Sequence, residues 1–458
     1  MNKVAASIES AAETSDKPPS SPLVKDDEPP LETTAATAPI QTKLIPQAYS
    51  RWNDWRWQIS HRIRTVDQLC GYFPDKNYCQ SISPVVAKYP MAITPYYASL
   101  IRKVDMADPV FQMCVPQLNE LHDPAFLSSD PLEEQEDMPV PGLVHRYPDR
   151  ALLIATTTCS MYCRHCTRKR VAGTRESNIS ARRLEQVCAY LSAHPEISDV
   201  IVSGGDPLTM SDDAIEMILS AIRRIQSVQI IRIGTRVPVV LPMRITDSLV
   251  TMLKKYHPLW INTHFNHPDE ITDESVCACT KLADAGIPLG NQSVLLRNVN
   301  DRPQIIEHLC RKLVRMRVRP YYLYQCDLVR GIEHFRTPVS RGIEIMEYLR
   351  GRLSGVAIPT FVIDAPHGGG KIPIMPNYIV STSPTQTVIR NFEGMLVAYP
   401  EPACYESAPA MAEPSHESAP GVWELSSGSF SHIQPAKTNR QTRRQNCCTH
   451  SDVSEVVG

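Results

Sequence analysis

The sequence predicts an α/β protein whose core is a full or partial barrel of parallel strands. From about residue 150 onward, six short β-like runs alternate with six helical stretches, and β-then-α units in series favour a parallel sheet with right-handed crossovers. Hydrophobic residues make up 42% of the 458 residues and charged residues 21%, so the chain can build a large core. A doubly wound open sheet is the alternative. Both folds place the chemistry at the carboxyl ends of the strands.

The units are recognised from the pattern of their apolar residues. The strand candidates are short runs between turn residues, at 151–157, 200–204, 229–235, 260–265, 288–296 and 320–325. The helix candidates follow them in turn, at about 180–194, 212–225, 245–256, 270–286, 303–315 and 336–354. Ahead of these units, apolar residues at near-helical spacing within residues 50–70 predict an amphipathic helix that opens the ordered part.

Composition divides the chain into five segments. Residues 1–45 contain no aromatic residue and are rich in Pro, Ser, Thr, Ala and acidic residues, so they cannot bury enough apolar surface to offset their chain entropy. The residues from 406 onward have a similar composition and a basic stretch near the end. We therefore expect a disordered tail over 1–45, a helical region over 46–145, the barrel core over 146–355, a closing segment over 356–405 and a disordered tail over 406–458.

Charge and hydropathy exclude several classes of protein. Lys and Arg number 47 against 49 for Asp and Glu, which argues against a mainly electrostatic binder of nucleic acid or of a membrane surface. No apolar run approaches the ~20 residues that span a bilayer, and the chain begins without a signal-peptide pattern. We expect a cytoplasmic protein. Its 14 cysteines are too sparse for a disulfide scaffold.

Three cysteines follow the first predicted strand in a C-x3-C-x2-C spacing: Cys159, Cys163 and Cys166. Three thiolates on one loop can hold three irons of a [4Fe–4S] cluster and leave the fourth iron open, whereas a structural zinc needs a fourth protein ligand. His165 could supply that ligand, but it directly precedes Cys166 and would compete for the same space. The spacing favours a radical S-adenosylmethionine (SAM) cluster over zinc.

Gly204, Gly205 and Asp206 follow the second predicted strand. Consecutive glycines let a ligand approach the backbone closely, and a carboxylate beside them can bind an ammonium group. Gly-Gly-Asp is also an ordinary turn. In the position after a cluster loop, it resembles the site that holds the amino group of SAM.

A glycine run over residues 368–370 ends at Lys371. It is not a Walker A loop, because Ala365 stands where the first glycine is required and Ile372 where Ser or Thr is required. A lysine in this place suits an amine that a planar aldehyde cofactor can reach. A flexible loop with a solvated lysine is the alternative.

Together these motifs resemble the lysine 2,3-aminomutase family. The resemblance runs from about residue 50 to 405 and is carried by CSMYCRHCTRKR, SGGDPL, HFNHP, LGNQSVLLRNVND, RPYYLYQCDL, DAPHGGGK and NFEGMLVAYPEP. It implies a partial (β/α)6 TIM-like radical SAM barrel with a [4Fe–4S] cluster, SAM and pyridoxal 5′-phosphate (PLP). It also implies an isomerase that converts L-lysine to β-lysine, an electron donor such as flavodoxin or ferredoxin, and a homo-oligomer.

The resemblance also implies a role for each matching residue. Cys159, Cys163 and Cys166 would bind the cluster, and Gly204, Gly205 and Asp206 would bind SAM. Lys371 matches the catalytic lysine that carries PLP. Arg146 and Arg150 match contacts to the PLP phosphate, a dianion that suits two guanidinium groups, although surface arginines before a strand are the alternative. Arg168 matches the residue that holds the substrate carboxylate, a choice that charge alone could not make among its basic neighbours.

Asp327 and Asp364 match the two carboxylates that receive the distal ammonium of lysine. Two unpaired carboxylates repel each other, so such a site demands a cation. This favours lysine, leaves arginine possible and disfavours glutamate. A helix cap or a turn is the alternative for either residue.

The chain departs from the family pattern at two places. His367 stands where a glycine usually precedes the run, and a positive φ at this position would suit His less well than Gly. Arg302 replaces one of the cysteines that bind an interfacial zinc in characterised members, and no cysteine cluster follows before Cys447. We therefore expect no interfacial zinc, and a dimer more than the family's tetramer.

Two other functions remain as hypotheses. The two acidic residues cannot separate lysine 2,3-aminomutase from arginine 2,3-aminomutase. A non-catalytic iron–sulfur binding protein is the third candidate, and the retention of Lys371, Arg168 and the three cysteines argues against it.

Overall fold

The structure, a computed structural model, describes residues 49–73, 76–171, 173, 175–402, 425–428, 432 and 439–448. The predicted N-terminal tail over 1–45 therefore lies outside the described residues. Those that are described all belong to one compact unit, residues 39–458.

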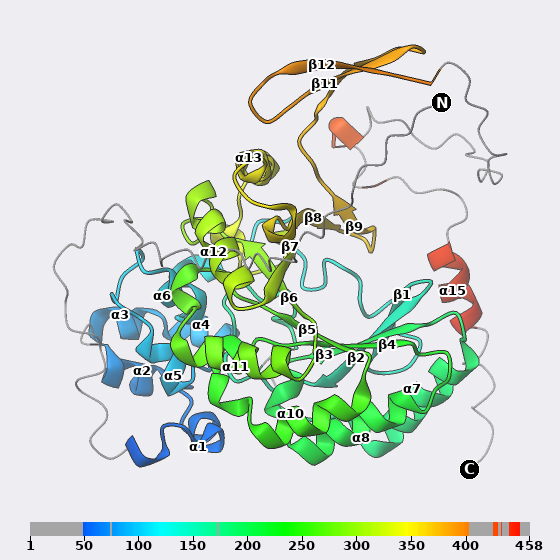
Figure 1. Ribbon diagram of the computed structural model, residues 1–458. Helices are drawn as coiled ribbons and strands as arrows, with labels where there is room; N and C mark the ends of the chain where they lie inside the picture. Colours follow the sequence, from blue (N-terminus) through cyan, green and yellow to red (C-terminus); the bar gives the residue numbers. More distant parts are fainter. Residues whose placement is uncertain are drawn as a thin grey trace, which may run out of the picture. The chain divides into compact units, whose positions relative to one another are not determined.

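A nine-stranded sheet in the order β1 to β9 forms the centre of the molecule (Figure 1). Its strands are β1 (Leu143–Tyr147), β2 (Arg150–Thr156), β3 (Asp199–Gly204), β4 (Ile230–Gly234), β5 (Leu259–Thr263), β6 (Leu289–Leu295), β7 (Val318–Gln325), β8 (Thr360–Ala365) and β9 (Gly370–Pro373). Strands β2 to β8 pair in parallel with their neighbours, while β1 and β9 are antiparallel edge strands. The spatial order follows the chain order, as in a barrel, and this rejects the doubly wound alternative.

All six predicted strands are confirmed, but the parallel sheet contains one strand more than expected. Residues 360–365 form β8, which pairs in parallel with β7 through Tyr322–Tyr324 and Thr360–Val362. The sequence analysis had assigned this stretch to the closing segment. Pairing with β7 extends the barrel sheet into that segment and places Asp364 on a strand.

The six predicted crossover helices are also confirmed. They are α7 (Ala181–Ala193), α8 (Asp212–Arg223), α10 (Asp247–Leu253), α11 (Asp273–Asp284), α12 (Pro303–Arg315) and α13 (Val339–Leu349), with α9 (Val237–Val240) as an additional turn of helix. Side chains of Ser180, Ser211, Thr246 and Thr272 accept backbone N–H groups at four of the helix starts.

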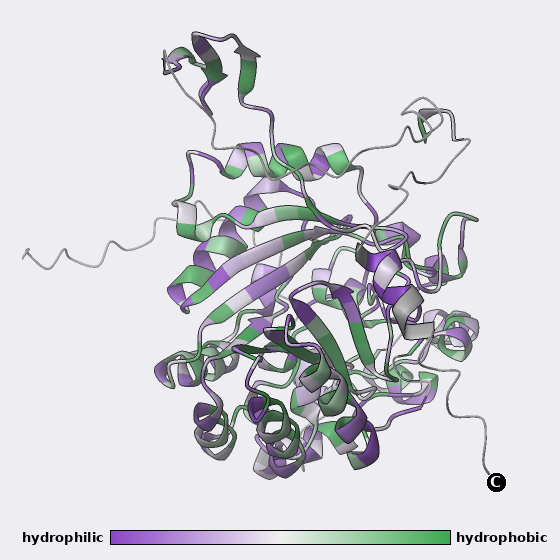
Figure 2. Ribbon diagram, turned by 90° about the vertical axis from the view of Figure 1, so that its right-hand side faces the viewer, coloured by the Kyte–Doolittle hydropathy of each residue, from purple (hydrophilic) through white to green (hydrophobic). Residues whose placement is uncertain are grey.

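Apolar residues on one side of each crossover helix pack against the sheet. In α8 these residues are Ile215, Ile218, Leu219 and Ile222, at the spacing of one helix face. The outer helices accordingly show a hydrophobic and a hydrophilic side (Figure 2). Burial of these faces positions the carboxyl ends of the strands, where the predicted site lies.

The N-terminal region consists of the short helices α1 (Trp55–Ser60), α2 (Val66–Tyr72), α3 (Lys76–Ser81), α4 (Ser83–Lys88), α5 (Pro95–Ser99) and α6 (Pro109–Cys114). The single helix predicted within 50–70 is wrong, because the chain breaks between α1 and α2. Ile63 forms a β-bridge with Ile93 in the gap, and Thr65 starts α2 in a capping box with Gln68.

Beyond the barrel, β10 (Ile379–Thr382), β11 (Gln386–Arg390) and β12 (Leu396–Pro400) form a separate antiparallel sheet. The predicted C-terminal disordered tail needs a correction where it is described, because α15 (Asn439–Cys448) is a helix. Its arginines pair with acidic residues near β1, a long-range contact that composition does not reveal. Residues 406–424, 429–431, 433–438 and 449–458 of that tail lie outside the described residues.

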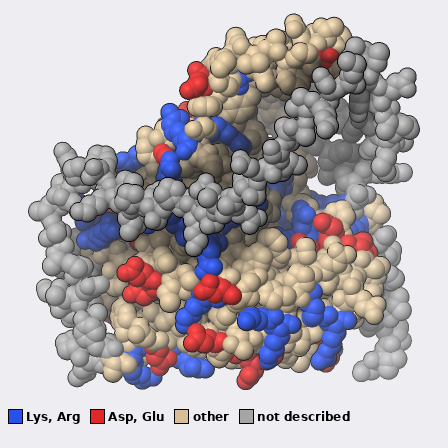
Figure 3. Space-filling view, in the orientation of Figure 1, with Lys and Arg blue, Asp and Glu red and all other residues tan. Residues whose placement is uncertain are grey.

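Charge and hydropathy of the described surface fit the balanced composition. Lys and Arg lie interspersed with Asp and Glu over the lower part of the face in Figure 3. Among the described residues, no helix combines the length and the apolar character needed to cross a membrane.

The contact between α13 and β8 yields a stability prediction. A Cβ at Gly342 would lie 2.1 Å from Cζ of the buried Phe361 ring. We expect Gly342→Ala to lower the free energy of unfolding by about 1–3 kcal/mol through overpacking, although Ala alone would favour the helix by about 1 kcal/mol. Urea denaturation measures the change.

Gly355→Ala is the matched control, because a Cβ there meets nothing within 4 Å. Equal effects of the two substitutions would contradict close packing of α13 on β8.

Candidate functional site

A single cavity of about 850 Å³ opens within the sheet. Its lining includes every residue that the sequence analysis assigned to a site: Arg146, Arg150, Cys159, Cys163, Cys166, Arg168, Gly204, Gly205, Asp206, Asp327, Asp364 and Lys371. These residues come from β1, from the start of β2 and the loop after it, from the end of β3 and the loop after it, from the loop after β7, and from β8 and β9. The fold thus brings together groups that are up to about half of the chain apart.

The cysteine loop follows β2 and is fastened to the N-terminal helical region. The backbone N–H of Tyr162 donates to the carbonyl of Ala92, and that of Arg164 donates to the carbonyl of Met113, each at 2.9 Å. Burial, together with the neighbouring Cys163, raises the pKa of Cys166 to about 11. Such thiols lose their protons to a bound metal rather than to water, which fits a metal cluster.

An iron–sulfur cube does not need its three thiol ligands to converge on one metal ion. Among the described residues, no three His, Cys, Asp or Glu side chains are grouped as ligands of one ion. A cubane binds each thiolate through a different iron, so its ligands need not converge on one point. The loop is therefore compatible with the expected [4Fe–4S] cluster.

The basic residues in and just after the cysteine loop have different surroundings in the structure. Arg164 and Lys169 donate to the fully buried Glu120, away from the cavity, at 2.5 and 2.8 Å. Arg168 donates to Glu134 from both Nε and Nη2 and also lines the cavity. Of these three residues, Arg168 is the one that lines the cavity, and its contact with the substrate carboxylate stays a prediction.

Glu134 is a site residue that the sequence analysis missed. Burial alone would raise its pKa, but the charge and hydrogen bonds of Arg168, together with the charge of Arg170, lower the pKa to about 2. An ionised Glu134 fixes Nε and Nη2 of Arg168. Among the described residues, no group accepts a hydrogen bond from Nη1 of Arg168. This nitrogen is therefore available to a ligand in the cavity.

The two glycines after β3 are required by close backbone contact. Gly204 has φ +121°, and a Cβ there would lie 2.3 Å from the carbonyl oxygen of Thr156. A Cβ at Gly205 would lie 2.3 Å from the carbonyl oxygen of Thr158. The segment thus packs directly against the start of the cysteine loop.

Asp206 is buried beside these glycines. It accepts hydrogen bonds from the hydroxyl of Thr235 at 2.6 Å and from the backbone N–H of Arg236 at 2.7 Å, so it ties the end of β3 to the end of β4. Burial raises its pKa to about 6. Both carboxylate oxygens already serve the protein, so direct contact with the amino group of SAM stays a prediction.

Arg236 is a second residue that the sequence analysis missed. It follows β4, is 7% exposed, and donates from Nη1 to the sulfur of Cys163 at 2.6 Å and from Nη2 to Glu270 at 2.6 Å. A lone arginine after the apolar strand, followed by the apolar run VPVV, was the only sequence signal. It places a positive charge directly beside the cluster ligands.

Lys371 lies on β9 beside Asp364 of β8. Its Nζ donates to Asp364 Oδ2 at 2.6 Å, and its backbone N–H donates to the hydroxyl of Tyr147 at 2.9 Å. The guanidinium of Arg150 lies 3.9 Å from the centre of the Tyr147 ring. Tyr147 therefore lies between the backbone of Lys371 and one of the predicted phosphate-binding arginines, so the residues predicted to bind PLP lie close together.

The second of those arginines is already held by the protein. Arg146 donates from Nε to Asp137 at 2.9 Å and from Nη2 to the carbonyl of Leu132.

His367 has the positive φ that suits histidine less well than the glycine usual at this position in the family. Its φ is +58°, in the left-handed region that glycine adopts freely. The His367 ring compensates by pairing with Glu133 at 3.1 Å.

Asp327 and Asp364 form the acidic end of the cavity. Burial and the charge of Asp364 together raise the pKa of Asp327 to about 6, and among the described residues the hydroxyl of Thr167 is the one hydrogen-bond donor to it, at 2.5 Å. Oδ1 of Asp364 is buried and has no hydrogen-bond partner among the described residues. The Lys371 ammonium is the cation that contacts Asp364 here among the described residues, so this end of the cavity holds two carboxylates against one positive charge.

A parallel partial barrel with three cysteines after its first parallel strand defines a radical SAM enzyme. The radical SAM superfamily model matches residues 153–309, and the lysine-2,3-aminomutase model matches residues 346–456, which include α15. The chain is 56% identical over 355 residues to the L-lysine 2,3-aminomutase of Clostridium subterminale, covering 77% of this chain and 85% of that protein.

Two further relatives show the range of the similarity. The L-lysine 2,3-aminomutase of Fusobacterium nucleatum is 50% identical over 414 residues, 89% of this chain and 97% of that protein. The glutamate 2,3-aminomutase of Clostridioides difficile is 46% identical over 347 residues, 76% of this chain and 82% of that protein. This chain belongs to the lysine 2,3-aminomutase family. It is an isomerase, and membership implies a [4Fe–4S] cluster, SAM and PLP as its cofactors.

The acidic end of the cavity yields a prediction about pH and stability. The pKa of Asp327 is about 6 in the folded protein and about 3.9 in an unfolded chain. At a pH between these two values, Asp327 is mostly protonated in the folded state and mostly ionised in the unfolded chain. At neutral pH the buried charge costs about 2–3 kcal/mol of stability. We expect Asp327→Asn to be more stable than the parent at pH 7.5, with the difference shrinking as the pH falls below 6.

Urea denaturation of the ligand-free proteins at pH 7.5 and 5 measures both quantities. Asp247→Asn is the control, because its side chain is 89% exposed and should change little. A less stable Asp327→Asn protein at pH 7.5 would show that the carboxylate already has a cationic partner.

Proposed function

We propose that this enzyme converts L-lysine to β-lysine by moving the amino group from C2 to C3. The observation that carries the choice of substrate is the pair of buried carboxylates, Asp327 and Asp364. One of them has a raised pKa and the other a buried oxygen without a partner. A side-chain ammonium would satisfy both, whereas the carboxylate of a glutamate side chain would be repelled.

The other residues have roles that follow their places in the cavity. Arg168, held by Glu134, binds the substrate carboxylate through the nitrogen that Glu134 leaves available. Substrate is then held at both ends, by a guanidinium at its carboxylate and by two carboxylates at its ammonium. This arrangement orients C2 and C3 and leaves little freedom for other reactions.

The cofactors occupy the remaining parts of the same cavity. Cys159, Cys163 and Cys166 hold the cluster, and Gly204, Gly205 and Asp206 border SAM. Lys371 carries PLP, with Arg146 and Arg150 at its phosphate. When bound, these cofactors supply the radical that removes a hydrogen atom and the carrier for the migrating amino group. Burial of the site excludes water from that chemistry.

Arginine remains the second candidate substrate, because its guanidinium would also satisfy both carboxylates. A non-catalytic iron–sulfur protein would have no use for Lys371 held at 2.6 Å from Asp364 inside the same cavity as the cysteines. We therefore rank it last.

An electron donor such as flavodoxin or ferredoxin is part of the proposal, because reductive chemistry needs one electron from outside the protein. We also propose a homo-oligomer in the cytoplasm. The β10–β12 sheet supports the oligomer, since Leu396 and Tyr399 are each 61% exposed and Ile379 is 56% exposed. Apolar surface of this kind is typical of protein interfaces.

Product analysis tests the proposed substrate. The protein is reconstituted anaerobically with iron, sulfide, SAM, PLP and a reductant, and offered L-lysine, L-arginine or L-glutamate. We expect β-lysine as the main product and no reaction with glutamate. Cys159→Ala and Lys371→Ala proteins are the controls and should form none. Preferential turnover of glutamate would reject the role of the acidic pair.

Substitution of the carboxylates tests the ammonium contacts. Asp327→Asn keeps the shape but removes one charge, so kcat/KM for lysine should fall roughly ten- to a hundredfold, the equivalent of about 1.5–3 kcal/mol. A neutral analogue of matched length should lose much less. Asp364→Asn should behave similarly but also disturb Lys371, its partner at 2.6 Å. Equal losses for the charged and the neutral substrate would contradict the assignment.

A further inference from the structure

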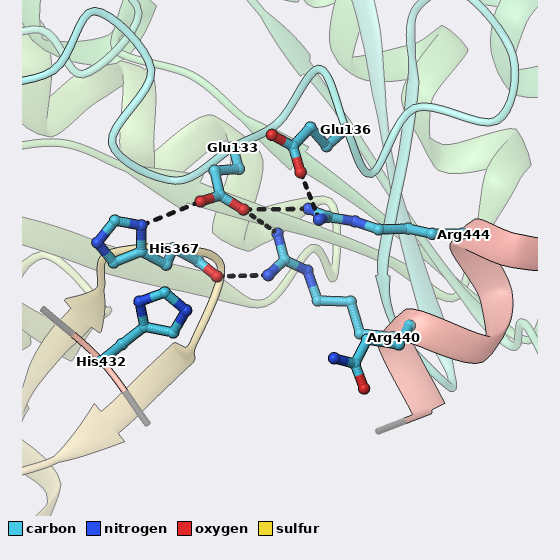
Figure 4. A pocket seen from close by; sticks show the side chains of 7 residues that line it. Glu133, Glu136, His367, His432, Arg440 and Arg444 are labelled. Carbon is cyan, nitrogen blue, oxygen red and sulfur yellow. Dashed lines mark hydrogen bonds and ion pairs between the residues drawn. The ribbon is translucent and has the colours of Figure 1, made fainter. Parts of the chain in front are cut away.

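Helix α15 lies against the cofactor side of the cavity although it comes from the far C-terminus. Figure 4 shows Arg440 and Arg444 on one side of α15, pointing toward Glu133, Glu136 and the loop that carries His367. Arg440 donates to Asp137 at 2.8 Å, to Glu133 at 3.1 Å and to the carbonyl of His367. Each of its three nitrogen groups therefore has a partner near the lysine loop.

Arg444 repeats this pattern one helical turn later. It donates to Asp137 at 3.1 Å, to Glu133 at 3.2 Å and to Glu136. Residues four apart lie on the same face of a helix, so the two guanidinium groups reach the same acidic segment. Their side chains are only 16% and 27% exposed, and ion pairs shielded in this way are stronger than those in open solvent.

The acidic residues that pair with α15 also contact the predicted PLP site. Asp137, whose side chain is 1% exposed, accepts from Arg440 and Arg444 and also from Nε of Arg146 at 2.9 Å. Arg146 is a predicted contact of the PLP phosphate. Arg443 of α15 also donates to the carbonyl of Arg146. The helix thus holds one of the phosphate-site arginines from two directions.

The same contacts hold two strained backbone positions. Glu133 has φ +51° and His367 has φ +58°, both unusual for residues other than glycine. Their side chains pair with each other at 3.1 Å, and Arg440 contacts both residues. Backbone strain of this kind persists only where the surrounding structure maintains it. Arg440 is one of the groups that maintain it, and His367 lies four residues before Lys371.

The ion pairs of α15 also set the balance of charge beside the predicted PLP site. Glu133, Glu136 and Asp137 carry three negative charges, and Arg146, Arg440 and Arg444 carry three positive charges. Without Arg440 and Arg444, Arg146 would be the one arginine left in these ion pairs with Glu133, Glu136 and Asp137, beside the predicted site of a phosphate dianion. The acidic side chains would compete with the phosphate for Arg146 and repel it.

We propose that Arg440 and Arg444 of α15 are positioning residues for PLP. They neutralise Glu133 and Asp137, and they keep Arg146 and the lysine loop in place. The proposal rests on the assignment of PLP to Lys371. It gives the C-terminal segment, predicted as a disordered tail, a part in the active site.

The test measures PLP binding directly. Apoprotein with a reconstituted cluster is titrated with PLP, and binding to lysine is followed by its visible absorbance. For Arg440→Gln with Arg444→Gln, we expect the dissociation constant of PLP to rise roughly ten- to a hundredfold, as for loss of buried charged hydrogen bonds. Iron content and reductive cleavage of SAM should match the parent, since the described partners of Arg440 and Arg444 are Glu133, Glu136, Asp137 and His367, outside the cysteine loop and β3.

Two variants separate charge compensation from a general loss of structure. Arg440→Lys with Arg444→Lys keeps both charges and should restore most of the PLP affinity. Arg311→Gln with Arg341→Gln removes the same charge from exposed ion pairs on α12 and α13 and should leave PLP affinity unchanged. If the glutamine double variant does not fold, Arg444→Gln alone should give a smaller rise in the same constant.

The outcomes distinguish this proposal from the proposed function. PLP affinity equal to the parent in the glutamine variant rejects the role of α15 and leaves the function intact. Parallel loss of iron and PLP also rejects it, because the effect is then global. A parent protein that binds no PLP at Lys371 rejects the proposed function itself.

Discussion

The active site of this protein depends on the need of buried charges for partners. One acidic segment, Asp130–Asp137, supplies the partners for arginines that arrive from separate parts of the chain. Glu134 holds Arg168 of the cysteine loop, and Asp137 holds Arg146 of β1 and two arginines of α15. A buried guanidinium without a counter-charge would be strongly destabilising. The segment therefore fixes the cluster loop, the phosphate site and the C-terminal helix in one arrangement.

At the acidic end of the cavity, by contrast, the buried carboxylates lack enough counter-charge. Asp327 and Asp364 are buried without enough positive charge, which raises the pKa of Asp327 to about 6 and leaves one oxygen of Asp364 without a partner among the described residues. The buried charge lowers stability here, and under the proposed function the cationic side chain of the substrate supplies the missing positive charge. The same physics thus stabilises the framework at one end of the cavity and creates specificity at the other.

The parallel sheet explains how distant motifs meet. Its strands follow one another in chain order, so the loop after each strand emerges at the same edge. The cysteine loop, the glycines after β3, Arg236 after β4 and Asp327 after β7 gather there in one cavity. β8 and β9 then return Asp364 and Lys371 to it. Membership of the lysine 2,3-aminomutase family accounts for the chemistry that this arrangement serves.

The sequence by itself determined the features that depend on local pattern. Alternating strands and helices, the cysteine spacing and the glycine run before Lys371 are all short-range signals, and each has a physical reason that acts within a few residues. The tertiary structure decided the rest: the added strand β8, the break between α1 and α2, and the roles of Glu134, Tyr147 and Arg236. It also placed α15, whose Arg440 meets Asp137 from 303 residues away. Such contacts require the whole fold, because composition shows which charges are present but not which of them burial brings together.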